Sequence, residues 1–214
     1  MSFRLSWPNR ITFARILLIP LFVLALVQAR EGDPLFRWVG LALLVLVCAG
    51  DALDGYLARR LHSRSRLGAL LDPLADKLLM TAGYLLLSFM SWPEPTIPKW
   101  VAVIVISRDV LMVVFFLALV TLGTKFHQVA PSFLGKLCTA FQMSTLVATL
   151  SAPGFEAVLG GDATRMFLAA LFFITAWLTI VTGIDYLYAA RTQLGSPESA
   201  ALIESDDPDE NPAA

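Results

Sequence analysis

Four aspartates are grouped within 26 residues of this 214-residue sequence, in the stretch DALDGYLARRLHSRSRLGALLDPLAD. The pattern is D-x-x-D-G-x-x-A-R, then eight residues, then G-x-x-x-D-x-x-x-D. Ligation by carboxylates alone favours a hard cation, Mg²⁺ or Mn²⁺. The sequence therefore predicts a metal site whose ligands are Asp51, Asp54, Asp72 and Asp76.

The spacing of these aspartates fits two helices that face each other. Asp51 and Asp54 are three residues apart, and Asp72 and Asp76 are four apart, so each pair projects from one helix face. The basic segment Arg60–Leu67 can turn the chain between them. A solvated charge at a helix end would explain any single aspartate, but not the whole spaced motif, because unpaired carboxylates are rare in membrane helices.

The other fixed positions of the motif suit a phosphate-bearing ligand. Gly55 and Ala58 have small side chains, which would let a ligand approach the backbone closely. Arg59 is a natural partner for a phosphate group, and Gly68 would allow close packing of the two motif helices.

The composition is that of a membrane protein. Hydrophobic residues make up 57% of the chain, charged residues only 15%, and the mean hydropathy is +0.70. The segment after Leu194 carries six acidic residues and no Lys or Arg, so the rest of the chain is net basic, which suits anionic lipids and phosphates. We expect a membrane domain over residues 1–192 and an acidic, disordered tail over residues 193–214.

The apolar runs predict an all-α, polytopic membrane protein with six transmembrane helices and an N-terminal interfacial segment over residues 1–10. The stretches Ser91–Pro98, with three prolines, and Pro153–Ala163, with three glycines, are expected to be loops. The expected helices are Ile11–Ala29, Trp38–Arg60, Gly68–Met90, Lys99–Gly123, Phe133–Ala152 and Thr164–Ala190.

The distribution of basic residues predicts the orientation. With the N-terminus in the cytoplasm, ten Lys and Arg fall on the cytoplasmic side and four on the other. Both termini and the aspartate motif are then cytoplasmic. A cleaved signal peptide is an alternative for the first apolar run, but Arg15 within the run and Pro8-Asn9 before it argue against that interpretation.

The aspartate motif resembles, position for position, the signature of the CDP-alcohol phosphatidyltransferases. The string P-N-x-x-T-x-x-R near the N-terminus is also similar to the first helix of that family, although a helix N-cap and a snorkelling arginine would explain the same residues. The resemblance implies that Asp76 is also the general base. The CDP-lipid contacts that it implies are Asn9, Thr12, Arg15, Gly55, Ala58, Arg59, Ser65 and Gly68.

The same resemblance implies a reaction. An alcohol attacks the β-phosphate of CDP-diacylglycerol and CMP leaves, with two metal ions, Mg²⁺ or Mn²⁺, at the pyrophosphate. It also implies a homodimer among membrane lipids. Other stretches, D-P-x-A-D-K, S-R-D and G-K-x-x-T-x-x-Q, are similar to the glycerol-type branch of the family, which comprises phosphatidylglycerophosphate synthases and single-motif cardiolipin synthases.

The acceptor is predicted from three basic residues outside the motif. Lys77, Arg108 and Lys136 would form an anion pocket, which suits an acceptor that carries phosphate. Asp109 or Asp185 could instead be a purely structural partner of Arg108. We expect glycerol 3-phosphate as the acceptor. Phosphatidylglycerol is the alternative, because the Arg-Asp pair is similar to cardiolipin synthases, whereas bacterial glycerophosphate enzymes more often have Arg-Glu.

A transporter and a prenyltransferase compete with this interpretation. A divalent-ion transporter would place its carboxylates near the midplane, on broken helices within repeats. A UbiA-like prenyltransferase would need two separate Asp-rich motifs, and this chain has one composite motif. The basic loop could suggest nucleic acid, but its position between two membrane helices favours lipid headgroups, so we expect no nucleic-acid partner.

Overall fold

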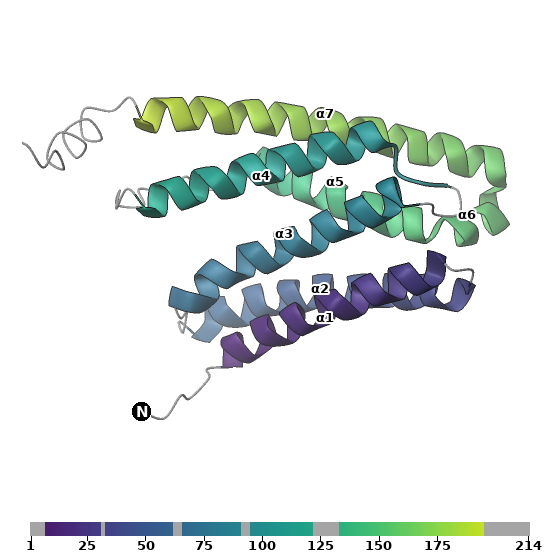
Figure 1. Ribbon diagram of the computed structural model, residues 1–214, viewed down its shortest axis with the longest axis horizontal. Helices are drawn as coiled ribbons and strands as arrows, with labels where there is room; N and C mark the ends of the chain where they lie inside the picture. Colours follow the sequence, from purple (N-terminus) through teal and green to yellow (C-terminus); the bar gives the residue numbers. More distant parts are fainter. Residues whose placement is uncertain (1–6, 31–32, 62–65, 91–94, 122–132, 195–214) are drawn as a thin grey trace, which may run out of the picture.

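The structure is a computed structural model that describes residues 7–30, 33–61, 66–90, 95–121 and 133–194. Side chains are described for residues 17–29, 33–50, 77–90, 95–114 and 133–188. Every regular element in these ranges is helical (Figure 1). The helices are α1 Trp7–Arg30, α2 Pro34–Leu61, α3 Arg66–Phe89, α4 Lys99–Thr121, α5 Phe133–Leu150, α6 Ala152–Leu159 and α7 Gly161–Leu194.

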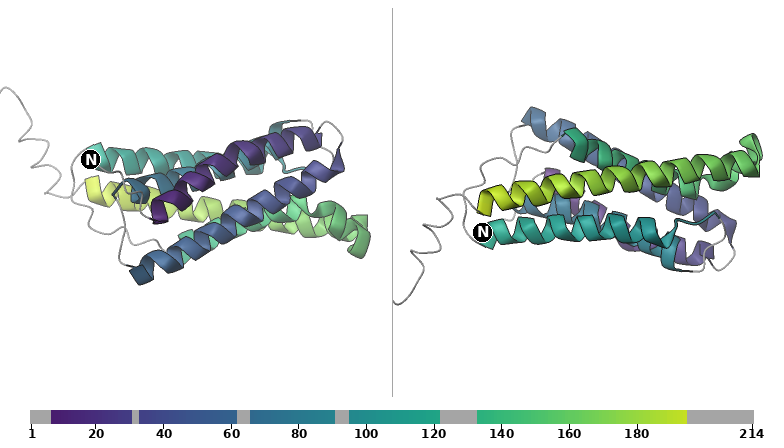
Figure 2. Two further views of the ribbon diagram at one scale, coloured as in Figure 1. Left: turned by 90° about the horizontal axis from the view of Figure 1, so that it is seen from below. Right: turned by 90° about the horizontal axis from the view of Figure 1, so that it is seen from above.

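The six long helices form one elongated bundle, and successive long helices run in opposite directions (Figures 1 and 2). Helix α1 packs against α2 and α3, while α7 packs against α4 and α5. The two groups meet where α3 contacts α4 and α5 and where α2 contacts α5. The core at this junction includes the fully buried Phe22, Met80, Tyr84 and Leu146.

Gly83 of α3 lets three helices meet closely. A methyl group at this position would lie 3.1 Å from two side-chain carbons of Leu146 on α5 and 3.6 Å from the ring of Phe22 on α1. The first of these distances is tighter than ordinary van der Waals contact. The glycine therefore sets how closely α3, which carries half of the aspartate motif, approaches its neighbours.

The predicted start of the second helix at Trp38 was wrong, because α2 begins at Pro34. The carboxylate of Asp33 accepts a hydrogen bond from the backbone N–H of Leu35 at 2.9 Å, as an N-cap does. Proline suits the first helical position because its missing N–H would have no partner there. The Asp-Pro pair therefore starts the helix four residues before the first apolar residue that we had used, Trp38.

The prediction that Pro153–Ala163 is a loop was also wrong, because α6 occupies most of it. Pro153 lies in the first turn of α6, where proline is tolerated. Gly160, with φ of 85°, ends the helix in a conformation that favours glycine, and α7 begins at the next residue. At the other end of the chain, residues 7–10 belong to α1, and the remainder of the expected interfacial segment lies outside the described residues.

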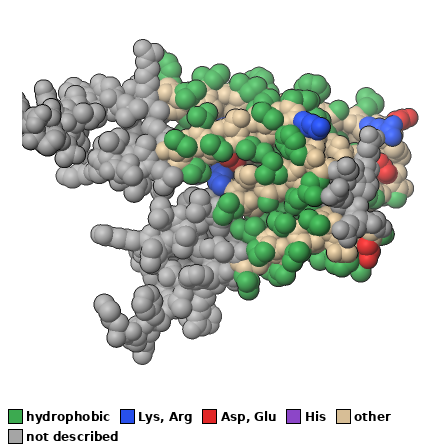
Figure 3. Space-filling model, viewed as in Figure 1, with side chains coloured by type: hydrophobic (Ala, Val, Ile, Leu, Met, Phe, Trp, Pro, Cys, Tyr) green, Lys and Arg blue, Asp and Glu red, His purple; other side chains and the backbone are tan. Residues whose placement is uncertain are grey.

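Two helices in the described part are long and apolar enough to cross a membrane, namely Phe133–Leu150 and Gly161–Tyr188. Three shorter apolar stretches lie at Leu17–Ala29, Pro34–Gly50 and Lys77–Phe89. In the described part of the face drawn in Figure 3, apolar side chains are spread over the surface and charged side chains are sparse. This surface fits contact with lipid.

Candidate active site

The four aspartates of the motif lie on the ends of two consecutive helices. Asp51 and Asp54 are in the last three turns of α2, and Asp72 and Asp76 are in the first three turns of α3. These helix ends lie at the same end of the bundle (Figure 1). The motif side chains are outside the described set, and among the side chains that are described there is no group of three or more potential metal ligands. The ligand roles therefore stay predictions.

The expected CDP-lipid contacts come from three helices and one connection. The backbone of α1 holds Asn9, Thr12 and Arg15, α2 holds Gly55, Ala58 and Arg59, and α3 holds Gly68. Figure 1 places the start of α1 at the same end of the bundle as the motif. Ser65 lies outside the described residues. The backbone thus brings these positions to one end of the molecule, and their roles are untested.

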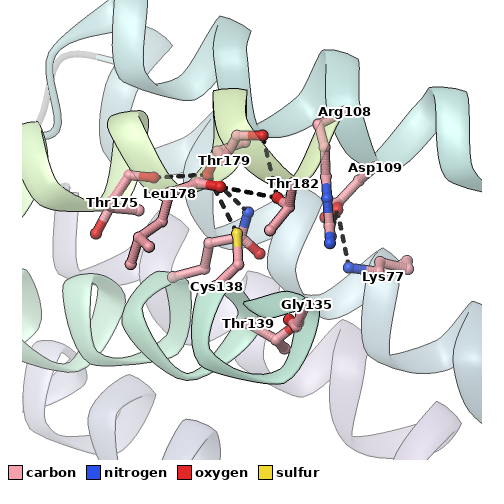
Figure 4. Close-up of polar contacts among 11 residues, drawn as sticks. Lys77, Arg108, Asp109, Gly135, Cys138, Thr139, Thr175, Leu178, Thr179 and Thr182 are labelled. Carbon is pink, nitrogen blue, oxygen red and sulfur yellow. Dashed lines mark hydrogen bonds and ion pairs between the residues drawn. The ribbon is translucent and has the colours of Figure 1, made fainter. Parts of the chain in front are cut away.

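Lys77 and Arg108 meet at one carboxylate, that of Asp109 (Figure 4). Lys77 follows the motif on α3, while Arg108 and Asp109 are consecutive on α4. Oδ1 of Asp109 accepts a hydrogen bond from Nζ of Lys77 and from Nη1 of Arg108, each at 2.8 Å. The side chains are 13%, 5% and 3% exposed for Lys77, Arg108 and Asp109. A buried three-charge cluster therefore begins one residue after Asp76.

Helix α7 forms a wall beside this cluster. The guanidinium carbon of Arg108 lies 5.4 Å from the ring centre of Tyr186, within the range of a cation–π contact. A methyl group on Gly183 would lie 3.7 Å from Cγ of Arg108, in ordinary contact. The stem of the arginine therefore runs along α7 where that helix has no side chain. Consecutive residues on a helix do not normally face each other, yet Arg108 and Asp109 are paired here. The contacts of Arg108 with α7 help to hold its side chain in this position.

Neutral hydrogen bonds join α7 to α5 beside the charged cluster (Figure 4). Nε2 of Gln142 donates to Oγ1 of Thr179 at 3.2 Å, and the hydroxyls of Thr145 and Thr175 lie 2.7 Å apart. Thr179 also donates to the backbone carbonyl of Thr175 at 2.7 Å. Hydrogen bonds of this kind satisfy polar groups inside a membrane bundle and fix the register of two helices.

The third predicted acceptor residue is placed differently. Lys136, near the start of α5, is exposed, and no contact in the described part joins it to Asp109. Asp185 is also exposed, and Asp109 is the carboxylate that pairs with Arg108. The structure thus brings together two of the three predicted residues.

A row of buried threonines on α7 was not predicted from the sequence, although the spacing of these residues indicates it. Thr175, Thr179 and Thr182 are spaced by four and three residues, which places them on one helix face, and all three are buried. Single threonines do not interrupt an apolar run in the sequence. In the structure, the hydroxyls of Thr179 and Thr182 donate to carbonyls of their own helix. The spacing of these threonines therefore indicates which face of α7 packs against α5.

Comparison with known proteins identifies relatives over most of the chain. A sequence model for the family described as CDP-alcohol phosphatidyltransferase matches residues 5–184. Three similar curated proteins carry the name CDP-diacylglycerol–glycerol-3-phosphate 3-phosphatidyltransferase, and each is 35% identical to this chain.

These relatives match along nearly their whole length. The Bacillus subtilis (strain 168) protein aligns over 190 residues, 84% of this chain and 92% of the relative. The Sodalis glossinidius (strain morsitans) protein aligns over 196 residues, 89% and 98%. The Escherichia coli (strain K12) protein aligns over 190 residues, 87% and 96%. The similarity therefore covers both the aspartate motif and the Lys77, Arg108 and Asp109 cluster.

Proposed function

The chain belongs to the CDP-alcohol phosphatidyltransferase family and is a membrane-bound phosphatidyltransferase, and from this premise we propose that it transfers a phosphatidyl group from CDP-diacylglycerol to glycerol 3-phosphate and releases CMP. The observation that carries the choice of acceptor is the cationic cluster of Lys77 and Arg108, which starts at the residue after Asp76. Full-length relatives named for the same donor and acceptor support it. Family membership disfavours the transporter and prenyltransferase interpretations.

Asp51, Asp54, Asp72 and Asp76 would hold two divalent ions, Mg²⁺ or Mn²⁺. The donor set fits such ions, because it consists of carboxylate oxygens supplied by two helices that end at the same side of the bundle. When bound, the ions supply charge stabilisation for the pyrophosphate and for the departing CMP. The expected contacts on α1, α2 and α3 would orient the cytidine diphosphate around this centre.

The remaining steps fall to side chains around Asp76 and Lys77. Lys77 and Arg108 bind the phosphate of glycerol 3-phosphate through donors that Asp109 leaves open. An acceptor whose phosphate is held by Lys77 and Arg108 would direct its free primary hydroxyl toward Asp76, which precedes Lys77 on α3. Asp76 then accepts the proton from this hydroxyl as the oxygen attacks the β-phosphate. The phosphate anchor thereby selects the hydroxyl that reacts.

We also propose six transmembrane spans, with both termini and the motif on the cytoplasmic side. The alternating direction of the six long helices supports this arrangement, and so does the excess of basic residues on the side that carries the motif. A homodimer and direct contacts with membrane lipids belong to the same proposal. They rest on the resemblance and on the apolar surface.

One feature favours a second candidate function, cardiolipin synthesis from CDP-diacylglycerol and phosphatidylglycerol. The Arg108-Asp109 pair is similar to the single-motif cardiolipin synthases of the same family. A phosphodiester acceptor would carry one negative charge to the cluster, whereas the phosphate of glycerol 3-phosphate carries close to two at neutral pH. The two acceptors therefore differ in how much of the cationic cluster they use.

A paired acceptor assay tests the proposal. Purified protein is incubated with CDP-diacylglycerol and Mg²⁺ or Mn²⁺, and either glycerol 3-phosphate or phosphatidylglycerol is added while CMP and the lipid product are followed. Phosphatidylglycerophosphate is the expected product. Cardiolipin as the product would keep the chemistry and replace the acceptor, and absence of CMP release with both acceptors would refute the proposal.

A further inference from the structure

A single carboxylate oxygen holds two cationic side chains from different helices. Oδ1 of Asp109 lies 2.8 Å from Nζ of Lys77 on α3 and 2.8 Å from Nη1 of Arg108 on α4. The two nitrogens are therefore at most twice that distance apart. Two cations this close repel each other strongly where water is scarce, and the shared carboxylate offsets that repulsion.

A purely structural role explains this cluster poorly. Buried ion pairs contribute little to stability unless their hydrogen bonds are complete, because removing charges from water is costly. Here Oδ2 of Asp109 and Nε of Arg108 are buried without a hydrogen-bond partner in the described part of the structure. The three groups also sum to one positive charge. The cluster thus keeps a net charge and unused hydrogen-bonding capacity inside an apolar bundle, as a site for an anion would.

We propose that Asp109 is a positioning residue for the acceptor, whose carboxylate keeps Lys77 and Arg108 side by side so that both bind one phosphate. The inference rests on the proposed function, because it takes the phosphate of glycerol 3-phosphate as the anion. Donor numbers allow it. The ammonium of Lys77 has three N–H groups and the guanidinium of Arg108 has five, and Asp109 accepts one from each.

The two cations would separate without this carboxylate. Lys77 is the more exposed of the pair and has a flexible four-carbon stem, so its ammonium would turn toward water. Arg108 would stay in the bundle, where its side chain lies over Tyr186 and beside Gly183. A phosphate would then meet one cation in place of two, which weakens acceptor binding and leaves the binding of CDP-diacylglycerol largely unchanged.

The test compares Asp109→Asn, which keeps the shape and removes the charge, with Asp109→Glu, which keeps the charge. CMP release by the full-length protein is measured while one substrate is varied and the other is saturating. For Asp109→Asn we expect the KM for glycerol 3-phosphate to rise on the order of tenfold, the scale of one lost charge-assisted contact, while the KM for CDP-diacylglycerol stays within about twofold. Asp109→Glu should recover much of the loss.

Asp185→Asn is the matched control, because it removes an exposed carboxylate of α7 that does not pair with Arg108. It should leave both KM values unchanged. If Asp109→Asn does not fold, Asp109→Glu and Asp109→Gln make the same comparison, since they differ in charge at equal size. An unchanged or lowered KM for glycerol 3-phosphate would overturn the inference, and so would an equal rise for both substrates or a Glu variant as impaired as its neutral counterpart.

The wild-type arm separates this inference from the proposed function. If the wild-type protein makes no phosphatidylglycerophosphate but does make cardiolipin, the proposed acceptor is wrong. The positioning role is then measured by the same ratio of KM values with phosphatidylglycerol as the acceptor. A selective rise in that KM supports the role of Asp109 with a phosphodiester, and no selective rise refutes it.

Discussion

Replacing Arg37 with methionine should destabilise the protein without changing its chemistry. Arg37 is 7% exposed, in the first turn of α2, and its side chain reaches the end of α5. Nε donates to the carbonyl of Leu150 at 2.9 Å, and Nη2 donates to the carbonyl of Thr149 at 2.7 Å. These carbonyls close α5 where the chain turns into α6, and carbonyls at a helix end have no partner within their own helix.

The size of the effect follows from these two bonds. A hydrogen bond to a charged group contributes about 1.5–3 kcal/mol, and two are lost in Arg37→Met. Part of that loss is recovered because methionine no longer buries a charge, so a net loss of about 3 kcal/mol is expected. For a protein of this size, this lowers the unfolding midpoint by roughly 6–12 °C. Arg37→Lys should lose about half as much, because an ammonium cannot bond both carbonyls as a guanidinium fork does.

Thermal unfolding in detergent, followed by tryptophan fluorescence, measures the stability, and CMP release at 25 °C measures the activity. Activity per folded molecule should be unchanged, since Arg37 lies about 21 Å along α2 from Asp51. Arg165→Met is the control, because this arginine is exposed near the start of α7, at the same end of the bundle. A midpoint within 2 °C of wild type for Arg37→Met would refute the reasoning, and lost activity at unchanged stability would mean that Arg37 acts in the reaction.

Further predictions concern helix contacts and the metal site. Gly183→Ala should be silent, because the added methyl group would be in ordinary contact with Arg108, and Gly183→Leu should raise the KM for glycerol 3-phosphate, because a longer side chain would displace Arg108; equal KM values in the two variants would contradict this. Gly83→Ala should lower stability by about 1–3 kcal/mol through overpacking, whereas Gly161→Ala, with no atom within 4 Å, should not, and matching midpoints would show that the bundle relaxes freely. Asp72→Asn should reduce CMP release by about 100-fold or more and abolish thermal stabilisation by added Mg²⁺ in a protein that still folds, and normal turnover in it would remove Asp72 from the metal site.

The sequence was sufficient for the long helices because each has an apolar run of several turns, even where a charged residue such as Arg15 or Arg108 interrupts it. The sequence-based prediction was wrong where the start of a helix depends on one or two residues, as at the starts of α2 and α6. Trp38 was taken as the start of the second helix, and three glycines were taken as the sign of a loop over Pro153–Ala163. In the structure Pro34 and Pro153 each lie in the first turn of a helix, where proline is tolerated. Both errors come from overlooking a proline that marks the start of a helix.

The candidate site was likewise predictable from the sequence only in part. The aspartate motif is readable because its residues are neighbours on two consecutive helices, and regular spacing fixes their faces. The meeting of Lys77 with Arg108 depends on how α3 lies against α4, which no local pattern encodes. The side chain of Arg108, which pairs with its own neighbour Asp109, also lies beside Gly183 of a third helix, α7. Tertiary packing, not helix periodicity, therefore decides which buried charges share a partner.

Helix α7 connects these observations, because one of its faces contacts both the neutral hydrogen bonds of α5 and the charged cluster. Thr175 and Thr179 face α5 and have neutral hydrogen bonds with Thr145 and Gln142. The same face continues, one and two turns later, to Gly183 and Tyr186, which lie against Arg108.

Neutral bonds inside an apolar bundle can be completed at small cost, so they can fix the register of α7 permanently. Charges cannot be buried so cheaply. In the described part of the chain, Oδ2 of Asp109 and Nε of Arg108 lack a hydrogen-bond partner, and so does the neutral Oε1 of Gln142. The charged cluster differs from the neutral network in its net positive charge, which is what a binding site for an anionic acceptor requires. The neutral contacts hold the wall in place whether or not the acceptor is bound, and the charged groups retain the donors and the positive charge that only the acceptor can use.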